Sequence, residues 1–311
     1  MQSLPKPLAA IDVGTNTVRM LVAARDGGRL RPLLRMRRIT GMGRDLRDTG
    51  AIGDRELRES VAALRAFRRE IDRLGVVRVR ACGTAALRDA TNRDAFLAKA
   101  AATGIPVEVI SPGEEARLTW TGVTRGGRGE RGVVVMDIGG GSTEFIAGPG
   151  RGESASLPIG VVVLLGVFRL SDPPAPWQVR NLKYYLAERI GAGTRAWDRR
   201  RVRRLVGTAG TFTTLAALDM KMTAYRPERI DGYAMPITKV RAWEDRLCRL
   251  TAGEVLALPG MEKGRERYIV PGICQAAAAM DRFGVGKLEI SDAGLLEGIL
   301  LGLPPGKGEA R

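Results

Sequence analysis

Histidine is absent from all 311 residues of this chain. Its absence excludes Ser-His and Cys-His nucleophile pairs and every metal site that needs an imidazole ligand. The cysteines are only three, Cys82, Cys248 and Cys274, and they form no CxxC pair, so the sequence predicts neither a disulfide framework nor a thiolate zinc site. Any chemistry must therefore use carboxylates, hydroxyls, Arg, Lys, backbone amides or a cation bound by oxygen atoms.

Long apolar runs are also missing. The longest, residues 159–168, is much shorter than the roughly 20 residues that cross a bilayer. The first residues do not resemble a signal peptide, because Asp12 interrupts the short apolar patch after Lys6. We therefore expect a cytoplasmic protein without a membrane partner. Aromatic residues make up only 5% of the chain and no recognised nucleic-acid-binding module is present, so no specific nucleic-acid partner is expected.

Positive charge, by contrast, is abundant. Lys and Arg number 50 against 34 Asp and Glu, which gives a formal net charge of +16. Such a surface attracts polyanions, and nucleic acid, polyphosphate and anionic nucleotides all qualify. The Arg-rich segment 198–205 is either part of a polyanion track or a solvated face that precedes a strand. An arginine-rich surface without any binding role is the alternative for the chain as a whole.

One sequence element occurs twice. Residues 10–23 read AIDVGTNTVRMLVA, and residues 135–147 read VMDIGGGSTEFIA. Their alignment pairs Asp12 with Asp137, Gly14 with Gly139, and Thr17 with Ser142. Strand-forming residues flank the glycines on both sides, so each copy is predicted to be a strand, a tight turn and a second strand. A Walker A or Rossmann loop differs, because its glycines open a helix.

Each predicted hairpin suits a phosphate group. Glycine lets backbone N–H groups approach an anion closely, and the neighbouring hydroxyl and amide side chains add further donors. The alternative is a pair of Gly-rich turns with no ligand, which is less plausible for two matched copies than for one. The predicted phosphate-binding residues of the two hairpins are Gly14, Thr15, Asn16, Thr17, Gly139, Gly140, Gly141, Ser142 and Thr143.

Three carboxylates accompany these hairpins. Asp12 and Asp137 end the first strand of each copy, and Glu144 follows the hydroxyl residues of the second. Carboxylates repel a bare phosphate, so their placement is reasonable if a hard cation such as Mg²⁺ lies between them. We therefore expect Asp12, Asp137 and Glu144 to hold Mg²⁺, and a K⁺ requirement stays open.

A third glycine cluster follows a strand-like segment at residues 203–218, RRLVGTAGTFTTLAAL. Thr211 is predicted to cap a helix that runs through Leu215 and Leu218, with the preceding amides facing an anion at the positive end of that helix. A purely structural loop is equally compatible with this pattern. The candidate binding residues here are Gly207, Thr208, Gly210 and Thr211.

In this order, the three loops resemble the phosphate-1, phosphate-2 and adenosine motifs of the actin, sugar-kinase and heat-shock ATPase superfamily. More narrowly, DVGTNTVRML, CGTAALRDATN, VEVISPGEEARLTWTGV and DIGGGSTEF are very similar to the exopolyphosphatase and guanosine pentaphosphate phosphohydrolase (Ppx/GppA) family. The similarity continues through MGRDLRDTGAI, LPIG, VGTAGTFTTLAAL and ISDAGLLEG, and so covers nearly the whole chain.

The resemblance implies an α/β fold of two actin-like (ribonuclease H-like) domains, each a mixed sheet flanked by helices, with the active site in the cleft between them. We expect the domains at residues 1–124 and 125–311, joined at the charged, Gly-rich junction 126–132. The chain resembles the short form of the family, and a homodimer is expected. Residues 54–74 carry apolar side chains at helical spacing and are predicted to form a scaffold helix.

The resemblance also assigns two further site residues. Arg88 corresponds to an arginine that contacts the substrate phosphate, and the alternative is an arginine paired with a local acid. Glu115 corresponds to the catalytic glutamate, whereas its neighbour Glu114 is predicted to complete a capping box with Ser111, with Pro112 at the first helical position. At the start of a helix, Glu115 should stay ionised and orient water.

The expected reaction is Mg²⁺-dependent hydrolysis of the terminal phosphoanhydride of inorganic polyphosphate. Guanosine pentaphosphate is the alternative substrate, and an ATP-dependent kinase of the same superfold or a nonenzymatic polyanion-binding protein are the alternative classes. Two segments depart from the family pattern: residues 161–168 are wholly apolar apart from Gly166, and Leu296 replaces an arginine. They affect the path beyond the terminal phosphate and the subunit interface.

Overall fold

The computed structural model describes residues 6–26, 29–126, 131–148 and 154–304. The chain divides into two compact units, of which the first comprises Met1–Gly127 and Gly294–Arg311 and the second comprises Arg128–Ala293. Part of the expected junction, residues 127–130, lies outside the described residues. None of the helices in the described segments is long and apolar enough to cross a membrane.

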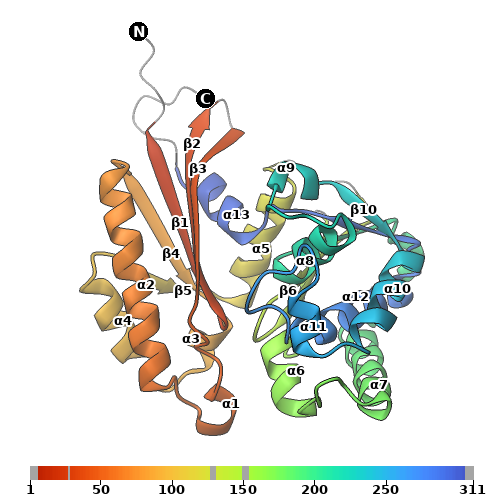
Figure 1. Cartoon of the computed structure of the whole chain (residues 1–311). Helices are drawn as coiled ribbons and strands as arrows, with labels where there is room; N and C mark the ends of the chain where they lie inside the picture. Colours follow the sequence, from red (N-terminus) through yellow and green to blue (C-terminus); the bar gives the residue numbers. More distant parts are fainter. Residues whose placement is uncertain (1–5, 27–28, 127–130, 149–153, 305–311) are drawn as a thin grey trace. The chain divides into compact units, whose positions relative to one another are not determined.

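The first unit is built on a five-stranded mixed sheet in the order β3-β2-β1-β4-β5 (Figure 1). β1 is antiparallel to β2 and parallel to β4, and β5 continues the parallel part. The strands are β1 (Pro7–Val13), β2 (Thr17–Asp26), β3 (Arg29–Ile39), β4 (Arg78–Gly83) and β5 (Val107–Val109). The helices are α1 (Leu46–Thr49), α2 (Asp54–Arg73), α3 (Ala85–Asp89), α4 (Arg93–Ala101), α5 (Pro112–Val123) and α13 (Leu295–Gly302).

Helices cover both faces of this sheet. Because side chains alternate along a strand, Ile11 of β1 faces α2 and α4, whereas its neighbour Ala10 faces α5 and α13. The predicted scaffold helix is confirmed as α2, whose apolar stripe is completed by the fully buried Phe67. Leu296, one of the departures from the family pattern, packs in the apolar layer beneath α13.

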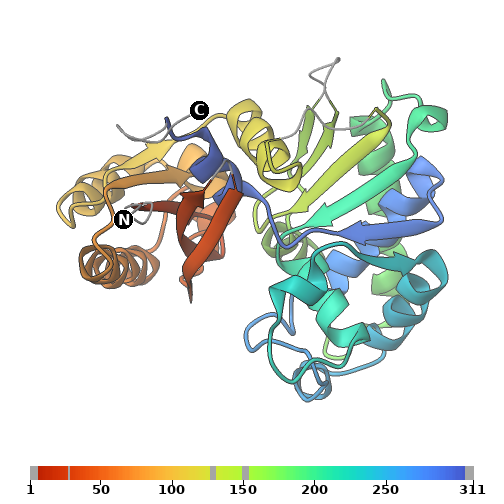
Figure 2. The ribbon, with the colours of Figure 1, turned by 90° about the horizontal axis from the view of Figure 1, so that it is seen from above.

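The second unit is built on a six-stranded mixed sheet in the order β10-β11-β9-β6-β7-β8, and Figure 2 shows its strands side by side. The strands are β6 (Val133–Ile138), β7 (Thr143–Ala147), β8 (Ser154–Leu157), β9 (Arg204–Thr208), β10 (Tyr233–Pro236) and β11 (Lys287–Ile290). The helices are α6 (Val161–Phe168), α7 (Pro176–Gly193), α8 (Gly210–Asp219), α9 (Pro227–Ile230), α10 (Ile237–Leu247), α11 (Ala252–Leu256) and α12 (Ile269–Phe283), with a 3₁₀ turn at Arg199–Arg201.

The two sheets share one connectivity, which confirms the expected fold class of two mixed sheets flanked by helices. In each, an antiparallel three-stranded meander is followed by parallel strands that add beside its first strand, as β4 and β5 do beside β1 and as β9 and β11 do beside β6. This repeat of the strand order matches the sequence repeat at Asp12 and Asp137.

The division into units differs from the expected boundaries at the C-terminal end of the chain. Residues from Gly294 onward belong to the first unit, whereas the sequence analysis assigned them to the second domain. The physical reason is the close packing of α13 on α5 and β1. A Cβ atom at Gly298 would lie 1.7 Å from the carbonyl oxygen of Leu118, and one at Gly122 would lie 1.9 Å from that of Gly294, so glycine is needed for this approach.

Candidate active site

Both predicted hairpins are present and have the same register. Asp12 pairs with Arg19 across the first hairpin, and Asp137 pairs with Glu144 across the second. In both, the first loop glycine donates its N–H to a carbonyl three residues later, at 3.0 Å. The first hairpin joins β1 to β2 and the second joins β6 to β7, so each loop lies at the carboxyl edge of the parallel strands of its sheet.

The loop of the first hairpin presents amides rather than carbonyls. The carbonyl oxygens of Thr15 and Asn16 accept hydrogen bonds of 2.8 to 3.0 Å from N–H groups in residues 40–43. The N–H groups of Thr15 and Asn16 themselves donate to no atom within the described residues. Because these carbonyl oxygens are hydrogen-bonded to residues 40–43, the loop presents mainly N–H groups, whose partial charge is positive.

The second hairpin repeats this arrangement with different residues behind it. The carbonyl oxygens of residues 139–141 accept from the N–H groups of residues 160–163, at 3.0 to 3.4 Å, at the start of α6. Within the described part of the chain, the N–H groups of residues 140–142 have no acceptor. A Cβ atom at Gly160 would lie 2.3 Å from the carbonyl oxygen of Gly140, so a glycine in the LPIG segment is required for the loop to rest on α6.

The carboxylates of the two hairpins have different surroundings. Asp12 Oδ2 accepts from Arg19 Nε at 3.0 Å and from its Nη2 at 2.5 Å, whereas Asp12 Oδ1 is buried without a hydrogen-bond partner. In the second hairpin, two carboxylates, Asp137 and Glu144, stand directly opposite each other, and Ser156 donates to Glu144 Oε1 at 2.8 Å. Like charges at directly opposed positions destabilise a sheet. The charges at matching positions thus cancel in the first hairpin and add in the second.

Among the residues that the structure describes, no three carboxylates or cysteines are grouped closely enough to hold a metal ion. Asp12 belongs to the first unit, whereas Asp137 and Glu144 belong to the second. The structure therefore brings two of the three expected metal ligands together, and the Mg²⁺ site stays a prediction.

The third glycine loop joins β9 to α8, at the same edge of the second sheet as the second hairpin. The predicted cap is wrong: α8 begins at Gly210, its N-cap position is Ala209, and Thr211 lies inside the helix. Ala209 has a φ of +69°, a conformation that residues other than glycine adopt rarely, so the sequence did not indicate this helix start. The helix does run through Leu215 and Leu218 as expected.

Several hydroxyls of the candidate site are held by the protein. Thr143 is completely buried and donates to Gln275 Oε1 of α12 at 2.7 Å, and Thr208 donates to the carbonyl oxygen of Ala293 at 2.8 Å. Thr211 packs against α12, where a Cβ atom at Gly272 would lie 2.6 Å from its side chain. These threonines therefore hold the loops against α12 and the segment after β11, and their contribution to ligand binding stays a prediction.

Arg88 and Glu115, which are far apart in the sequence, meet in the first unit. Arg88 lies on the short helix α3 after β4, and Glu115 lies in the first turns of α5 after β5, so both follow the same sheet edge as the first hairpin. Arg88 Nη1 donates to Glu115 Oε2 at 2.8 Å and to the carbonyl oxygen of Ile110 at 3.1 Å. Its other two nitrogen atoms have no acceptor in the described segments. The side chains of the pair are largely buried, at 17% and 12% exposure.

The adjacent residues Glu114 and Glu115 have different surroundings. Ser111 caps α5 by accepting from the N–H of Glu114 at 3.1 Å, with Pro112 at the first helical position. The reciprocal half of the predicted capping box is wrong, because the Glu114 carboxylate accepts from Arg117 at 2.8 and 2.9 Å and from Arg80 at 3.3 Å. The hydrogen bonds from Arg117 lower the pKa of Glu114 below its usual value.

The sequence analysis missed three contributors to this region. Arg19 neutralises Asp12, Gly160 supports the second loop, and Gln275 holds Thr143. The register of the first hairpin pairs Arg19 with Asp12, so a predicted hairpin with this turn would have indicated the role of Arg19. The contact of Gln275 spans 132 positions of the chain and carries no local signal.

The Arg-rich segment lies at the opposite end of β9 from the glycine loop, since Arg204 pairs with Val133 at the start of β6.

Comparison with known proteins agrees with this geometry. The sequence profile of the Ppx/GppA phosphatase family matches residues 21–305. Exopolyphosphatase 2 of Mycobacterium tuberculosis is 34% identical over 313 residues, which covers 95% of this chain and 98% of that protein. The crystal structure of the Ppx/GppA family member of Aquifex aeolicus is 32% identical, with a TM-score of 0.81 over 95% of this chain and 96% of the other.

A second solved structure, an exopolyphosphatase from Cytophaga hutchinsonii, is 28% identical, with a TM-score of 0.86 over 95% of this chain and 96% of the other. The family profile extends over both units, from within β2 to α13, and the match to the Mycobacterium relative covers 95% of the chain. The chain therefore belongs to the Ppx/GppA phosphatase family and is a phosphatase, that is, a hydrolase.

Proposed function

We propose that this chain hydrolyses the terminal phosphoanhydride of inorganic polyphosphate and releases phosphate. The observation that carries the proposal is the pair of hairpin loops whose carbonyls are bonded to the chain behind them and whose amides have no acceptor in the described residues. Consecutive N–H groups of this kind bind phosphate oxygens at little reorganisation cost, because the donors are already oriented.

In this proposal, Arg88 binds the phosphoryl group and Glu115 binds the attacking water. The nitrogen atoms of Arg88 that have no acceptor in the described residues bind oxygen atoms of the terminal phosphoryl group, for which a planar guanidinium is well suited. Glu115 accepts a hydrogen bond from the attacking water and orients it in line with the leaving phosphate. The ion pair of 2.8 Å between them fixes the relative orientation of both groups. No covalent intermediate is required.

The donor set fits Mg²⁺. The candidate ligands are carboxylate oxygens, which Mg²⁺ prefers, and a cation would relieve the repulsion between the opposed Asp137 and Glu144. The buried Oδ1 of Asp12, which lacks a hydrogen-bond partner, is a further oxygen that a cation or its bound water would satisfy. Mg²⁺ held by these residues would supply neutralisation of phosphate charge. We include K⁺ in this proposal as a second, monovalent cation that the reaction could require in addition to Mg²⁺.

The choice of polyphosphate over guanosine pentaphosphate follows from charge and from the relatives. A net charge of +16 attracts a long polyanion more strongly than a single nucleotide. The Mycobacterium relative and the Cytophaga structure both carry the name exopolyphosphatase. We also propose a cytoplasmic homodimer, in keeping with the sequence expectation.

The deciding experiment measures phosphate release by the purified chain from polyphosphate and from guanosine pentaphosphate, with Mg²⁺ or with EDTA. We expect Mg²⁺-dependent release that is faster from polyphosphate. Preferential release from guanosine pentaphosphate would replace the proposed substrate by the alternative one. ATP-dependent phosphorylation of an acceptor without phosphate release would indicate a kinase, and retention of RNA without any turnover would indicate a polyanion-binding protein.

A further inference from the structure

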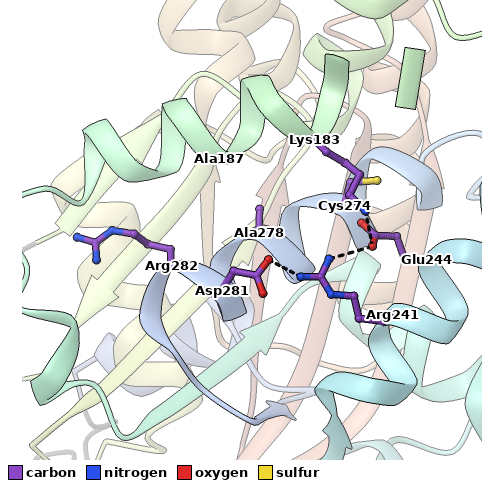
Figure 3. Close-up of a pocket in the computed structure, with 8 residues that line it drawn as sticks. All are labelled: Lys183, Ala187, Arg241, Glu244, Cys274, Ala278, Asp281 and Arg282. Atoms are coloured by element: carbon purple, nitrogen blue, oxygen red, sulfur yellow. Dashed lines mark hydrogen bonds and ion pairs between the residues drawn. The ribbon is translucent and has the colours of Figure 1, made fainter. Parts of the chain in front are cut away.

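A pocket of about 410 Å³ lies in the second unit between α7, α10 and α12 (Figure 3). Its lining includes Lys183 from α7, Arg241 and Glu244 from α10, and Cys274 and Asp281 from α12. These elements do not contribute any of the residues assigned to phosphate or metal binding. The pocket is therefore separate in sequence from the candidate active site.

Ion pairs organise the wall of this pocket. Lys183 Nζ lies 2.9 Å from Glu244 Oε2, Arg241 Nη1 lies 3.3 Å from the same oxygen, and Arg241 also pairs with Asp281. Glu244 is 1% exposed, so its carboxylate is a buried charge that two cations compensate. Figure 3 shows the side chain of Cys274 beside Lys183 and Glu244.

A second cysteine faces Cys274 across the contact between α10 and α12. Cys248 is the C-cap residue of α10 and follows Glu244 by one helical turn, on the same face of that helix. Glu244 and Cys274 line the same pocket, so Cys248 and Cys274 lie on the facing sides of the contact between α10 and α12. Cys248 is partly exposed, whereas Cys274 is 1% exposed. The two cysteines thus differ in access to solvent while lying at the same helix–helix contact.

The surroundings also divide the two thiols electrostatically. The neighbouring Cys274 lowers the pKa of Cys248, and Lys183 lowers it further, against the opposing effects of burial, Glu244 and Asp245. The neighbouring Cys248 and burial raise the pKa of Cys274. Cys82, in the first unit, is buried, and burial raises its pKa to about 12. An oxidant must reach the sulfur that it oxidises, so the partly exposed Cys248 is the reactive thiol of the pair, and the buried Cys82 is an inert one.

We propose that Cys248 and Cys274 form a peroxide-sensitive dithiol that closes into a disulfide between α10 and α12. Cys248 attacks one oxygen of hydrogen peroxide, which yields a sulfenic acid and one water molecule. The sulfur of Cys274 then attacks the sulfur of that sulfenic acid, and the hydroxide that leaves takes up the thiol proton as a second water molecule. Two thiols and one peroxide thus give one disulfide and two waters. This inference is independent of the proposed substrate.

Peptide mapping of the folded, full-length protein tests the proposal. After treatment with hydrogen peroxide and alkylation of the remaining thiols, trypsin would release Cys248 in residues 247–249 and Cys274 in residues 268–282, because Arg or Lys separates them. We expect these two peptides to be linked, with a mass two hydrogens below their sum, and Cys82 to be alkylated. Full alkylation of all three cysteines, or oxidation of Cys248 to a sulfinic acid without a link, would overturn the proposal.

Single substitutions separate the two steps. In Cys274→Ser, the sulfenic acid at Cys248 should accumulate and react with dimedone, because its resolving thiol is gone. In Cys248→Ser, loss of the Cys274 thiol to peroxide should slow at least tenfold relative to the parent. Cys82→Ser is the matched control and should form the link at the rate of the parent. A link that requires Cys82, or undiminished oxidation of Cys274 in Cys248→Ser, would contradict the assigned order.

Discussion

Replacing Glu115 by glutamine tests the candidate site most directly. Glutamine keeps the size of the side chain and an acceptor oxygen for Arg88, which donates to Glu115 at 2.8 Å, but it removes the negative charge that we propose polarises the attacking water. Loss of a general base typically reduces turnover by about 10² to 10⁴. At about 1.36 kcal/mol per factor of ten, this corresponds to a barrier increase of about 2.7 to 5.4 kcal/mol.

The stability effect of this substitution is much smaller. The variant keeps a hydrogen bond from a charged donor, which contributes about 1.5 to 3 kcal/mol, and loses only the charge of the acceptor, so Glu115→Gln should cost roughly 1 kcal/mol. For a chain of this size, that shifts the thermal midpoint by about 2 to 4 °C. The enzyme stays folded at the assay temperature, and the lost activity cannot then be attributed to unfolding.

The neighbouring residue provides the matched control. Glu114 is 27% exposed on its side chain and pairs with Arg80 and Arg117 at the surface, an arrangement that contributes about 0.2 to 1 kcal/mol. Glu114→Gln should therefore lower stability about as much as Glu115→Gln while keeping activity within a few-fold of the parent. The assay is phosphate release at saturating substrate, with thermal unfolding in parallel. An inactive Glu114→Gln beside a normal Glu115→Gln would refute the assignment of the catalytic residue.

Three further predictions concern packing, pH and metal dependence. Gly298→Ala should lower the free energy of unfolding by about 1 to 3 kcal/mol in a denaturant titration, because its Cβ would lie 1.7 Å from a backbone carbonyl oxygen of α5, whereas Gly302→Ala, with 3.6 Å to the nearest atom, should be nearly neutral. The hydrogen bond from Arg204 lowers the pKa of Glu289 in the folded protein. The contribution of Glu289 to the free energy of unfolding is therefore complete above its unfolded pKa of about 4.3 and is lost as the pH falls through its folded pKa. Glu289→Gln should therefore flatten the acid side of a plot of thermal midpoint against pH, and an unchanged slope would argue against the pair. Asp137→Ala or Glu144→Ala should abolish Mg²⁺-dependent turnover with the fold intact, and parental activity with unchanged Mg²⁺ dependence would exclude the cation site.

The hairpins and the scaffold helix could be predicted because their signals lie in short stretches of the sequence. The duplicated hairpins follow from alternation and glycine spacing around Asp12 and Asp137, and α2 follows from apolar residues at helical spacing. The start of α8 was missed because Ala209 has a positive φ, which is rare for alanine and therefore is not predicted from the sequence. The ion pair of Arg88 with Glu115 joins two elements 27 positions apart, and only the family resemblance had drawn attention to both.

The membership of α13 was the largest difference from expectation, and its reason is tertiary. Nothing in the sequence around Gly294 marks a change of unit, and the boundary was placed by the Gly-rich stretch near residue 126 alone. The glycines at positions 122 and 298 allow two helices to approach closely, which becomes visible only when both are placed on the sheet. Contiguity along the chain was therefore a poor guide to membership in a folding unit.

The return of α13 to the first unit has a practical consequence for dissecting this protein. A fragment that ends at residue 126 would lack the helix that covers Leu8, Ala10 and Leu21 of its sheet, and that apolar face would become accessible to solvent. Such a fragment should aggregate, whereas the same fragment with residues 294–304 attached through a flexible linker should be recoverable as a monodisperse species. By the same logic, a single proteolytic cut near residue 126 should nick the chain without releasing its two halves, because α13 would remain docked on α5 as a non-covalent tether.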